Sequence, residues 1–89
     1  MKVENFRNSI GNKVKNQFYI QDNDFIYFQS YNSIIAKKEV QGNNITLDKN
    51  YWDYSKTTSR YRNIFLNETT KETEAKIKNG TYALEDLNK

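Results

Sequence analysis

The fold of this chain is decided by residues 51–66, which read YWDYSKTTSRYRNIFL. Ser55, Thr57 and Thr58 are each suited to start a helix, because a hydroxyl at the N-cap accepts a hydrogen bond from a free backbone N–H group of the first turn. Beyond the cap, positions 54, 58, 61 and 65 recur at the spacing of one helix face. The segment therefore predicts a helix near residues 56–66.

This predicted helix has an aromatic side and a polar side. Tyr61, Ile64 and Phe65 are expected to face the core, since an apolar stripe at helical spacing is typical of a packed face. Lys56 and Arg60 then lie on the opposite side, in contact with solvent. Substitution of Phe65 by alanine is accordingly expected to be far more destabilising than loss of any exposed charge.

Trp52 and Tyr54 come just before the expected helix start. An aromatic side chain there either fixes the helix against a sheet or stands at the surface as an anchor for a partner. The spacing of Tyr54 from the inward residues favours the first role, and the sequence leaves both roles open.

Length and composition limit the core. The chain has 89 residues, which predicts a single domain over residues 1–89. At this size folding buries about 60% of the surface of the unfolded chain, so one modest core is expected. Apolar residues make up 36% of the chain and aromatic residues 15%, so Tyr and Phe supply much of that core.

Short apolar runs upstream of the helix predict strands. Phe25 to Gln29 and Ile34 to Val40 form a hairpin with its turn near Asn32, and residues 45–48 alternate at the period of a strand. Residues 13–20 are expected to add a fourth strand to this antiparallel meander. Residues 1–12 are predicted to be irregular or a short helix, because Val3, Phe6 and Ile10 have near-helical spacing among residues of low helix propensity.

A second helix is expected near residues 70–79. Thr69 and Glu72 have the spacing of a capping box, in which each side chain accepts from the other's backbone N–H. Lys76 lies four residues after Glu72, so it is expected to make one exposed ion pair of well under about 1 kcal/mol. With a last short strand near Tyr82, the chain is predicted to be α+β: a small meander of three to four strands packed by two C-terminal helices.

The same residues carry a family resemblance. Residues 28–36 (FQSYNSIIA), 45–48 (ITLD) and 51–66 resemble a family of small phage-encoded proteins of unknown function, whose pattern is S-Y-N-[ST], then Y-W-D-Y-S-x-T-T-x-[KR]-[YH], then F-L. The resemblance covers about residues 28–66 and leaves the first dozen residues outside. It implies a phage or prophage setting and carries no activity with it.

The composition argues against an enzyme. The chain has no His and no Cys, so zinc sites, cysteine nucleophiles and histidine bases are excluded, and no glycine-rich phosphate loop is present. Asp48 and Asp53 are expected to close a strand and to precede a helix rather than to form a catalytic acid pair. No cofactor and no metal are therefore expected. The absence of a long apolar run and of a signal-peptide core predicts a protein of the host cytoplasm, with no membrane partner.

Nucleic-acid binding is one hypothesis for function. Residues 21–66 carry six basic side chains that would have to form one surface, but also five acidic side chains, for a local net charge of +1. A protein that follows a nucleic-acid strand normally concentrates positive charge where it binds. The basic residues are Lys37, Lys38, Lys49, Lys56, Arg60 and Arg62.

Protein binding is the preferred hypothesis. Tyrosine, tryptophan and arginine dominate the centres of protein interfaces, and small phage proteins without catalytic groups commonly block a host protein stoichiometrically. The expected partner is a host protein such as a defence nuclease, which would make this chain an anti-CRISPR-like inhibitor. Replacing Arg60 and Arg62 together by alanine is expected to leave the melting temperature nearly unchanged. The candidate binding residues are Tyr31, Trp52, Tyr54, Lys56, Arg60 and Arg62.

Two further modes stay open. An exposed sheet edge is able to pair with a partner strand or with a second copy, giving a homo-oligomer. A small-molecule sponge for a nucleotide signal is the other alternative, and its expected sign is a closed polar pocket with arginine and aromatic stacking.

Overall fold

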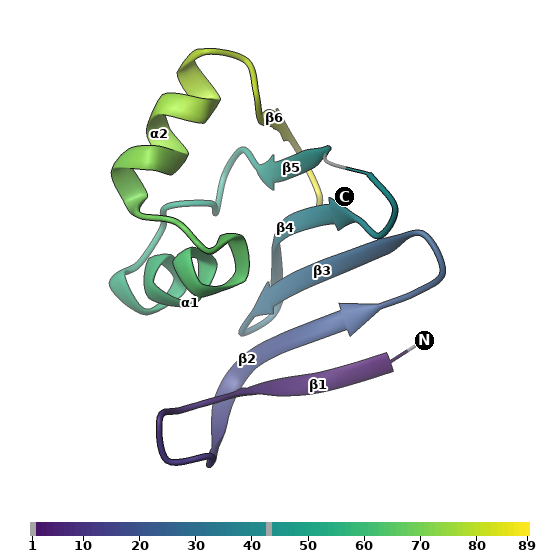
Figure 1. The fold of residues 1–89 in the computed structure, drawn as a ribbon, viewed down its shortest axis with the longest axis vertical. Helices are drawn as coiled ribbons and strands as arrows, with labels where there is room; N and C mark the ends of the chain where they lie inside the picture. Colours follow the sequence, from purple (N-terminus) through teal and green to yellow (C-terminus); the bar gives the residue numbers. More distant parts are fainter. Residues whose placement is uncertain (1, 43) are drawn as a thin grey trace.

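The computed structural model describes residues 2–42 and 44–89 and shows an α+β fold (Figure 1). One sheet has the strand order β1-β2-β3-β4-β5-β6, so the prediction of three to four strands is an undercount. Strands β1 to β5 are antiparallel neighbours, and β6 runs parallel to β5. Neither helix within the described residues is long and apolar enough to cross a membrane. The elements are β1 (Lys2–Arg7), β2 (Lys13–Gln21), β3 (Phe25–Ser30), β4 (Ser33–Glu39), β5 (Ile45–Asp48), α1 (Lys56–Leu66), α2 (Thr70–Lys78) and β6 (Ala83–Glu85).

Strand β1 corrects the prediction for residues 1–12, of which Met1 lies outside the described residues. Phe6 is only 2% exposed and stacks on the ring of Tyr19 with 4.0 Å between centroids, whereas Val3 is 61% exposed and Ile10 78%. The three apolar residues thus do not share a buried helical face. In β1 the backbone N–H and C=O groups of this segment form hydrogen bonds with β2. The same residues have low helix propensity, so a helix here would be less stable.

The meander confirms the predicted strands and hairpin. Strand β2 is the expected fourth strand, and the β3–β4 turn contains Tyr31 in the left-handed region with φ 56. Strand β4 also contains a bulge, because Phe28 pairs with Ala36 while Gln29 pairs with Ile34. The extra residue, Ile35, and Ala36 are both fully buried. A bulge sets two residues against one on the partner strand, which is how consecutive apolar residues enter the same core.

The core lies between one face of the sheet and α1. Phe28 and Leu47 on the sheet are fully buried, and Phe65 of α1 is 5% exposed with its ring centroid 5.9 Å from that of Phe28. Tyr82, just before β6, closes the same cluster at 6% exposure. Residues from both halves of the sequence therefore build one core, as expected for a single sheet covered by helices.

Helix α1 starts where the sequence predicts. The Ser55 hydroxyl accepts from the N–H of Thr58 at 3.1 Å, and Asn67 ends the helix with φ 55. The hydroxyls of Thr58 and Ser30 lie 2.9 Å apart and join the helix start to β3. Ile64, however, is 52% exposed, so its predicted place in the core is wrong.

Helix α2 has the predicted capping box, formed by Thr69 and Glu72. The prediction for Lys76 is wrong. Its ammonium lies 2.7 Å from a carboxylate oxygen of Glu68, not of Glu72, and the Glu68 side chain is 3% exposed. The Tyr82 hydroxyl donates to the same oxygen at 2.7 Å. This pair is therefore part of a half-buried network that joins the segment between α1 and α2 to the residue just before β6.

The Glu68 network predicts a response to acid. Burial by itself raises the pKa of Glu68, but hydrogen bonds from Lys76, Thr73 and Tyr82 outweigh it and hold that pKa below its usual value. Stabilisation from a carboxylate with a lowered pKa is present above its unfolded-state pKa and is lost as pH falls through the folded-state pKa. Glu68→Gln is therefore expected to flatten the loss of stability on acidification, measured by urea unfolding from about pH 7 to about pH 3.

The matched control is Glu4→Gln, which removes an exposed carboxylate that makes no ion pair within residues 2–42 and 44–89. This variant should follow the wild-type acid profile. Equal acid profiles for Glu68→Gln and the wild type would show that the network adds no stability.

Candidate functional site

Three of the predicted binding residues lie together on one side of α1. Tyr54, Lys56 and Arg60 line an open hollow of about 740 Å³ that also includes Ile64 and reaches Thr70 at the start of α2. Residues 56, 60 and 64 are four apart, so a helix brings them onto one face. Together with Tyr51, which touches Tyr54, the exposed side chains of this region form a surface that we name the α1 face: Tyr51, Tyr54, Lys56, Arg60 and Ile64.

Large apolar side chains are exposed on the α1 face. Tyr54 is 53% exposed, Ile64 52% and Tyr51 37%. The two tyrosine rings meet edge to face, with centroids 5.5 Å apart and an interplanar angle of 80°. Paired aromatic rings are already ordered, so they lose little conformational freedom when a partner covers them.

The positive charges of the α1 face are free of ion pairs. Among the described residues, ion pairs are formed by Arg62 and Lys76, and neither Lys56 nor Arg60 takes part. The Arg60 guanidinium lies 5.8 Å from the ring centroid of Tyr61, which orients it along the helix surface. An arginine held over an aromatic ring keeps its donors available for a partner.

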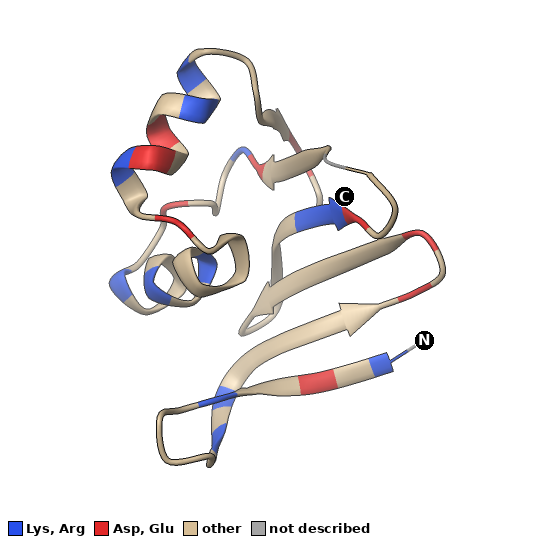
Figure 2. Ribbon diagram, viewed as in Figure 1, with Lys and Arg blue, Asp and Glu red and all other residues tan. Residues whose placement is uncertain are grey.

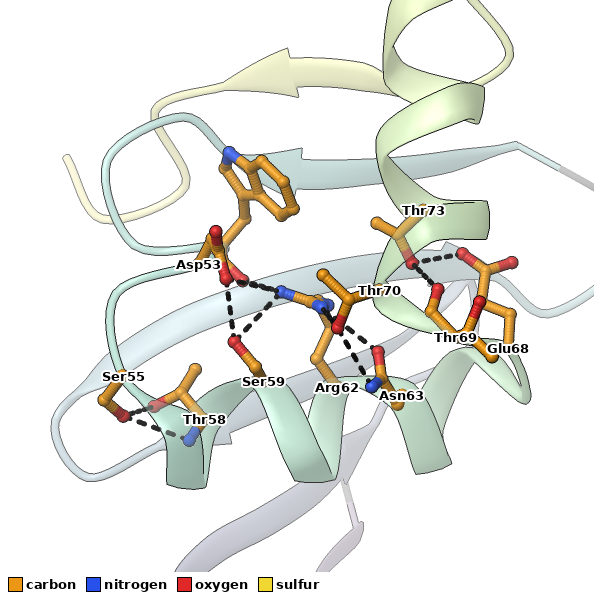
Figure 3. Close-up of polar contacts among 11 residues, drawn as sticks. Asp53, Ser55, Thr58, Ser59, Arg62, Asn63, Glu68, Thr69, Thr70 and Thr73 are labelled. Atoms are coloured by element: carbon orange, nitrogen blue, oxygen red, sulfur yellow. Dashed lines mark hydrogen bonds and ion pairs between the residues drawn. The ribbon is translucent and has the colours of Figure 1, made fainter.

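Arg62 corrects the sequence prediction, because it is fully buried rather than part of a binding surface. Its Nη1 donates to the backbone carbonyl of Trp52 and lies 3.6 Å from a carboxylate oxygen of Asp53. Its Nη2 donates to the side-chain oxygens of Asn63 and Thr70, each at 3.0 Å. Figure 3 shows these contacts converging on the guanidinium from the loop, from α1 and from α2.

Helical spacing explains this burial. Arg62 comes four residues after Thr58 and three before Phe65, the other two buried residues of α1. Burial lowers the pKa of the Arg62 guanidinium, and the Asp53 carboxylate counteracts that effect. Arg62 thus acts as an internal brace that holds the loop before α1 and the start of α2 in place.

The two acids around the loop have structural partners. Asp48 is fully buried at the end of β5, and one of its oxygens accepts from the N–H groups of Asn50 at 3.0 Å and Tyr51 at 2.9 Å. Asp53 pairs with Arg62 and accepts from the Ser59 hydroxyl at 2.9 Å. Asp48 therefore closes its strand as predicted, and Asp53 anchors the loop to the middle of α1.

The other two predicted binding residues lie outside the hollow. Trp52 is half-buried and packs against the core, with its ring 5.1 Å from the Arg62 guanidinium, so the structure assigns it the packing role. Tyr31 is 43% exposed at the β3–β4 turn and does not line the hollow. The predicted site is thus reduced to Tyr54, Lys56 and Arg60.

The basic residues that a nucleic-acid surface would need are dispersed (Figure 2). Lys38 lies on the core side of the sheet, 4.7 Å from the ring centroid of Phe65, and Lys37 lies on the other side, 4.7 Å from that of Phe25. Successive residues of a strand point to opposite faces, so the pair cannot share a surface. Arg62 is buried, which removes a third charge from the set.

Ile64 and Tyr51 are the residues that sequence reasoning missed. Ile64 has the required signal, because it lies four residues after Arg60 and eight after Lys56 on the polar side of α1. Tyr51 has no such signal, since its position depends on the turn that Asp48 holds.

Comparison with known proteins found a family model, described as "Family of unknown function (DUF8033)", that matches residues 1–80. The match begins at the first residue, so it includes the segment that lies outside the motif resemblance. Neither the comparison with curated proteins nor the comparison with solved structures found a match.

Proposed function

The chain belongs to this family of unknown function, and we propose that it acts without catalysis, by binding a protein partner through the α1 face. The observation that carries the proposal is the exposure of Tyr51, Tyr54 and Ile64 around Arg60, a charge with no ion-pair partner in the described chain. Aromatic and arginine side chains with this arrangement supply most of the binding energy at protein interfaces.

The chemistry of the α1 face suits a partner with an acidic rim and an apolar centre. Lys56 and Arg60 are two positive charges on one side of the helix, and Ile64 and Tyr54 are able to enter a shallow apolar recess. Opposite charges at the rim speed association, while the buried apolar contacts determine how slowly the complex dissociates.

We further propose a phage or prophage setting for this activity. The resemblance of residues 28–66 to phage-encoded proteins supports this setting. In the host cytoplasm the chain would block a host protein stoichiometrically, with a defence nuclease as the preferred target, in the manner of an anti-CRISPR inhibitor. Blocking requires affinity and no chemical step, which is consistent with a sequence lacking His and Cys.

Nucleic-acid binding through the same face is the second candidate. Its support is the position of Arg60 and Lys56 beside two exposed tyrosine rings, since bases stack on aromatic side chains and phosphates pair with arginine. The dispersal of the other basic residues works against it. A small-molecule sponge gains less support, because the hollow is open rather than closed.

The test replaces Tyr54 and Arg60 together by alanine. Both side chains are exposed, so the melting temperature should stay within a few degrees of wild type, while affinity for the partner should fall by about 30-fold or more, the equivalent of about 2 kcal/mol. Partner capture from infected-host lysate and protection of phage in an infection assay are the two measurements. Lys71→Ala, an exposed charge on α2 outside the α1 face, is the matched control.

Salt separates the two candidates. A protein complex built on tyrosine and isoleucine contacts should change little between about 50 and 200 mM salt, whereas a nucleic-acid complex with several phosphate contacts should weaken by orders of magnitude. If the double variant keeps full capture and full activity, the α1 face is not the binding surface.

A further inference from the structure

Within residues 2–42 and 44–89, no helix packs on the second face of the sheet. Side chains of both helices, such as Phe65 and Ile77, belong to one core cluster on a single face, and in Figure 1 both helices lie to the left of β1–β4. The residues that alternate with the core positions lie outside this cluster. Six of them are apolar and form what we name the outer patch: Val3, Phe18, Ile20, Phe25, Tyr27 and Ile34.

Strand register makes the outer patch continuous. Ile20 pairs with Val3 on one side and with Tyr27 on the other. Gln29 likewise pairs with both Phe18 and Ile34. Directly paired side chains on one face are about 4.5–5.5 Å apart, so Val3, Ile20 and Tyr27 form one row across β1–β3, while Gln29 lies between Phe18 and Ile34 in the next row. Val3 is 61% exposed and the other five residues are half-buried, so the patch is partly accessible. An apolar band at the surface of a small protein usually marks an interaction surface.

Charges of both signs border the outer patch, and Asp22 and Asp24 beside the β2–β3 turn add negative charge close to Tyr27. Two charged residues of β4 pair with members of the outer patch: Lys37 with Tyr27, and Glu39 with Phe25. They are two residues apart, so a positive and a negative side chain are neighbours on this face. A two-fold axis sets such a face against itself, and Lys37 of one copy then meets Glu39 of the other. An anionic partner such as nucleic acid would instead require an excess of positive charge.

We propose that the outer patch packs against the outer patch of a second copy of this chain, giving a two-fold dimer of two stacked sheets. Stacked sheets lie about 10 Å apart, a separation that aromatic and branched aliphatic side chains fill. The aromatic rings of Phe18, Phe25 and Tyr27 supply most of the contact area. The helix-covered side of each copy, including the α1 face, stays accessible in this dimer.

The size of the patch determines how strong the dimer is. Four strands about 4.8 Å apart, each contributing about five residues at about 3.3 Å, give roughly 320 Å² in projection. A standard interface buries about 800 Å² of accessible surface per partner, so this contact is at the small end. We therefore expect a weak, reversible dimer.

Sedimentation velocity of the full chain from about 1 to about 500 µM tests the proposal, and wild type is expected to pass from monomer to dimer across this range. Ile20→Thr with Tyr27→Thr keeps strand propensity while removing the apolar contact, so its dissociation constant should rise at least about tenfold. Tyr54→Ala with Arg60→Ala should dimerise like wild type, which separates this inference from the proposed function. Wild type that stays monomeric, or a threonine variant that dimerises normally, overturns the proposal.

Cross-linking distinguishes the face from the sheet edge and does not depend on how the threonine variant folds. The chain has no cysteine, so a single introduced thiol reports one position. Thr46→Cys, which pairs with Lys37, lies on the outer face close to the proposed two-fold axis and should be cross-linked between copies by a short bismaleimide. Glu4→Cys lies on edge strand β1, paired with the core-side Tyr19, and should not be cross-linked. The reverse result would mean that copies pair through the edge and would overturn the proposal.

Discussion

Phe65→Ala is expected to lower the free energy of unfolding by about 3–5 kcal/mol, because it removes a buried ring and leaves a cavity. Phe65 is 5% exposed, and its ring lies 5.9 Å from those of both Tyr19 and Phe28, so it joins α1 to the sheet. The Lys38 ammonium also lies 4.7 Å from its centroid. Domains are stable by about 5–15 kcal/mol, so this loss should leave the chain marginally folded in a urea titration.

The adjacent residue provides the control. Ile64→Ala removes an apolar side chain of similar kind that is 52% exposed, and its cost should stay within about 0.5 kcal/mol. The pair therefore measures which side of α1 faces the core. Equal costs for the two variants would mean that the inward face of α1 is assigned incorrectly.

Arg62→Ala is expected to destabilise the protein by about 3–5 kcal/mol, because removal of one member of a buried polar network leaves its partners with fewer hydrogen bonds. The Trp52 carbonyl and the Thr70 hydroxyl both lose a donor. Asp53 also loses its ion-pair partner, although its side chain is 48% exposed and water will compensate there. Urea unfolding followed by circular dichroism measures the effect.

Two variants test the geometry of this network. Arg62→Lys keeps the charge but replaces a planar group with five donors by a single ammonium, so it should recover only a small part of the loss. Arg60→Ala removes an exposed arginine of the same helix and should change stability by about 0.5 kcal/mol or less. A melting temperature for Arg62→Ala equal to that of Arg60→Ala would contradict the buried position of Arg62.

These expectations change how function has to be tested. The prediction that Arg60 and Arg62 are replaceable together without loss of stability assumed that both are exposed, whereas Arg62 is fully buried. A variant lacking Arg62 would lose function simply by unfolding. Tyr54 and Arg60 are the informative pair, since both are exposed on the α1 face.

Local signals predicted most of the secondary structure. The Ser55 cap and the apolar spacing after it predicted α1, and the Thr69–Glu72 capping box predicted the start of α2. The apolar runs on either side of Tyr31 predicted the hairpin, and the alternation of residues 45–48 predicted β5. These features depend on residues within a few positions of one another, so a single sequence is sufficient to find them.

Local signals did not predict strand β1 or the ion pair of Lys76. Phe6 is buried because it stacks on Tyr19 of the neighbouring strand. Lys76 pairs with Glu68, eight residues away, because the segment between α1 and α2 brings the Glu68 carboxylate next to α2. Glu72 had the better local spacing. Contacts between elements therefore overrode the preferred local pair.

The sequence by itself determined where the helices and most strands lie, that the fold is α+β, and that Lys56 and Arg60 share one exposed side of α1, because caps, periodicity and helical spacing act over a few residues. Its spacing favoured a packing role for Tyr54, which the structure instead shows 53% exposed beside these two residues. Only the tertiary structure decided that Arg62 is buried and Ile64 exposed. Both lie on the flanks of the predicted stripe, and their environment depends on which elements pack beside α1. The loop at Trp52 and the start of α2 meet the Arg62 side, and the described chain leaves the Ile64 side open to solvent.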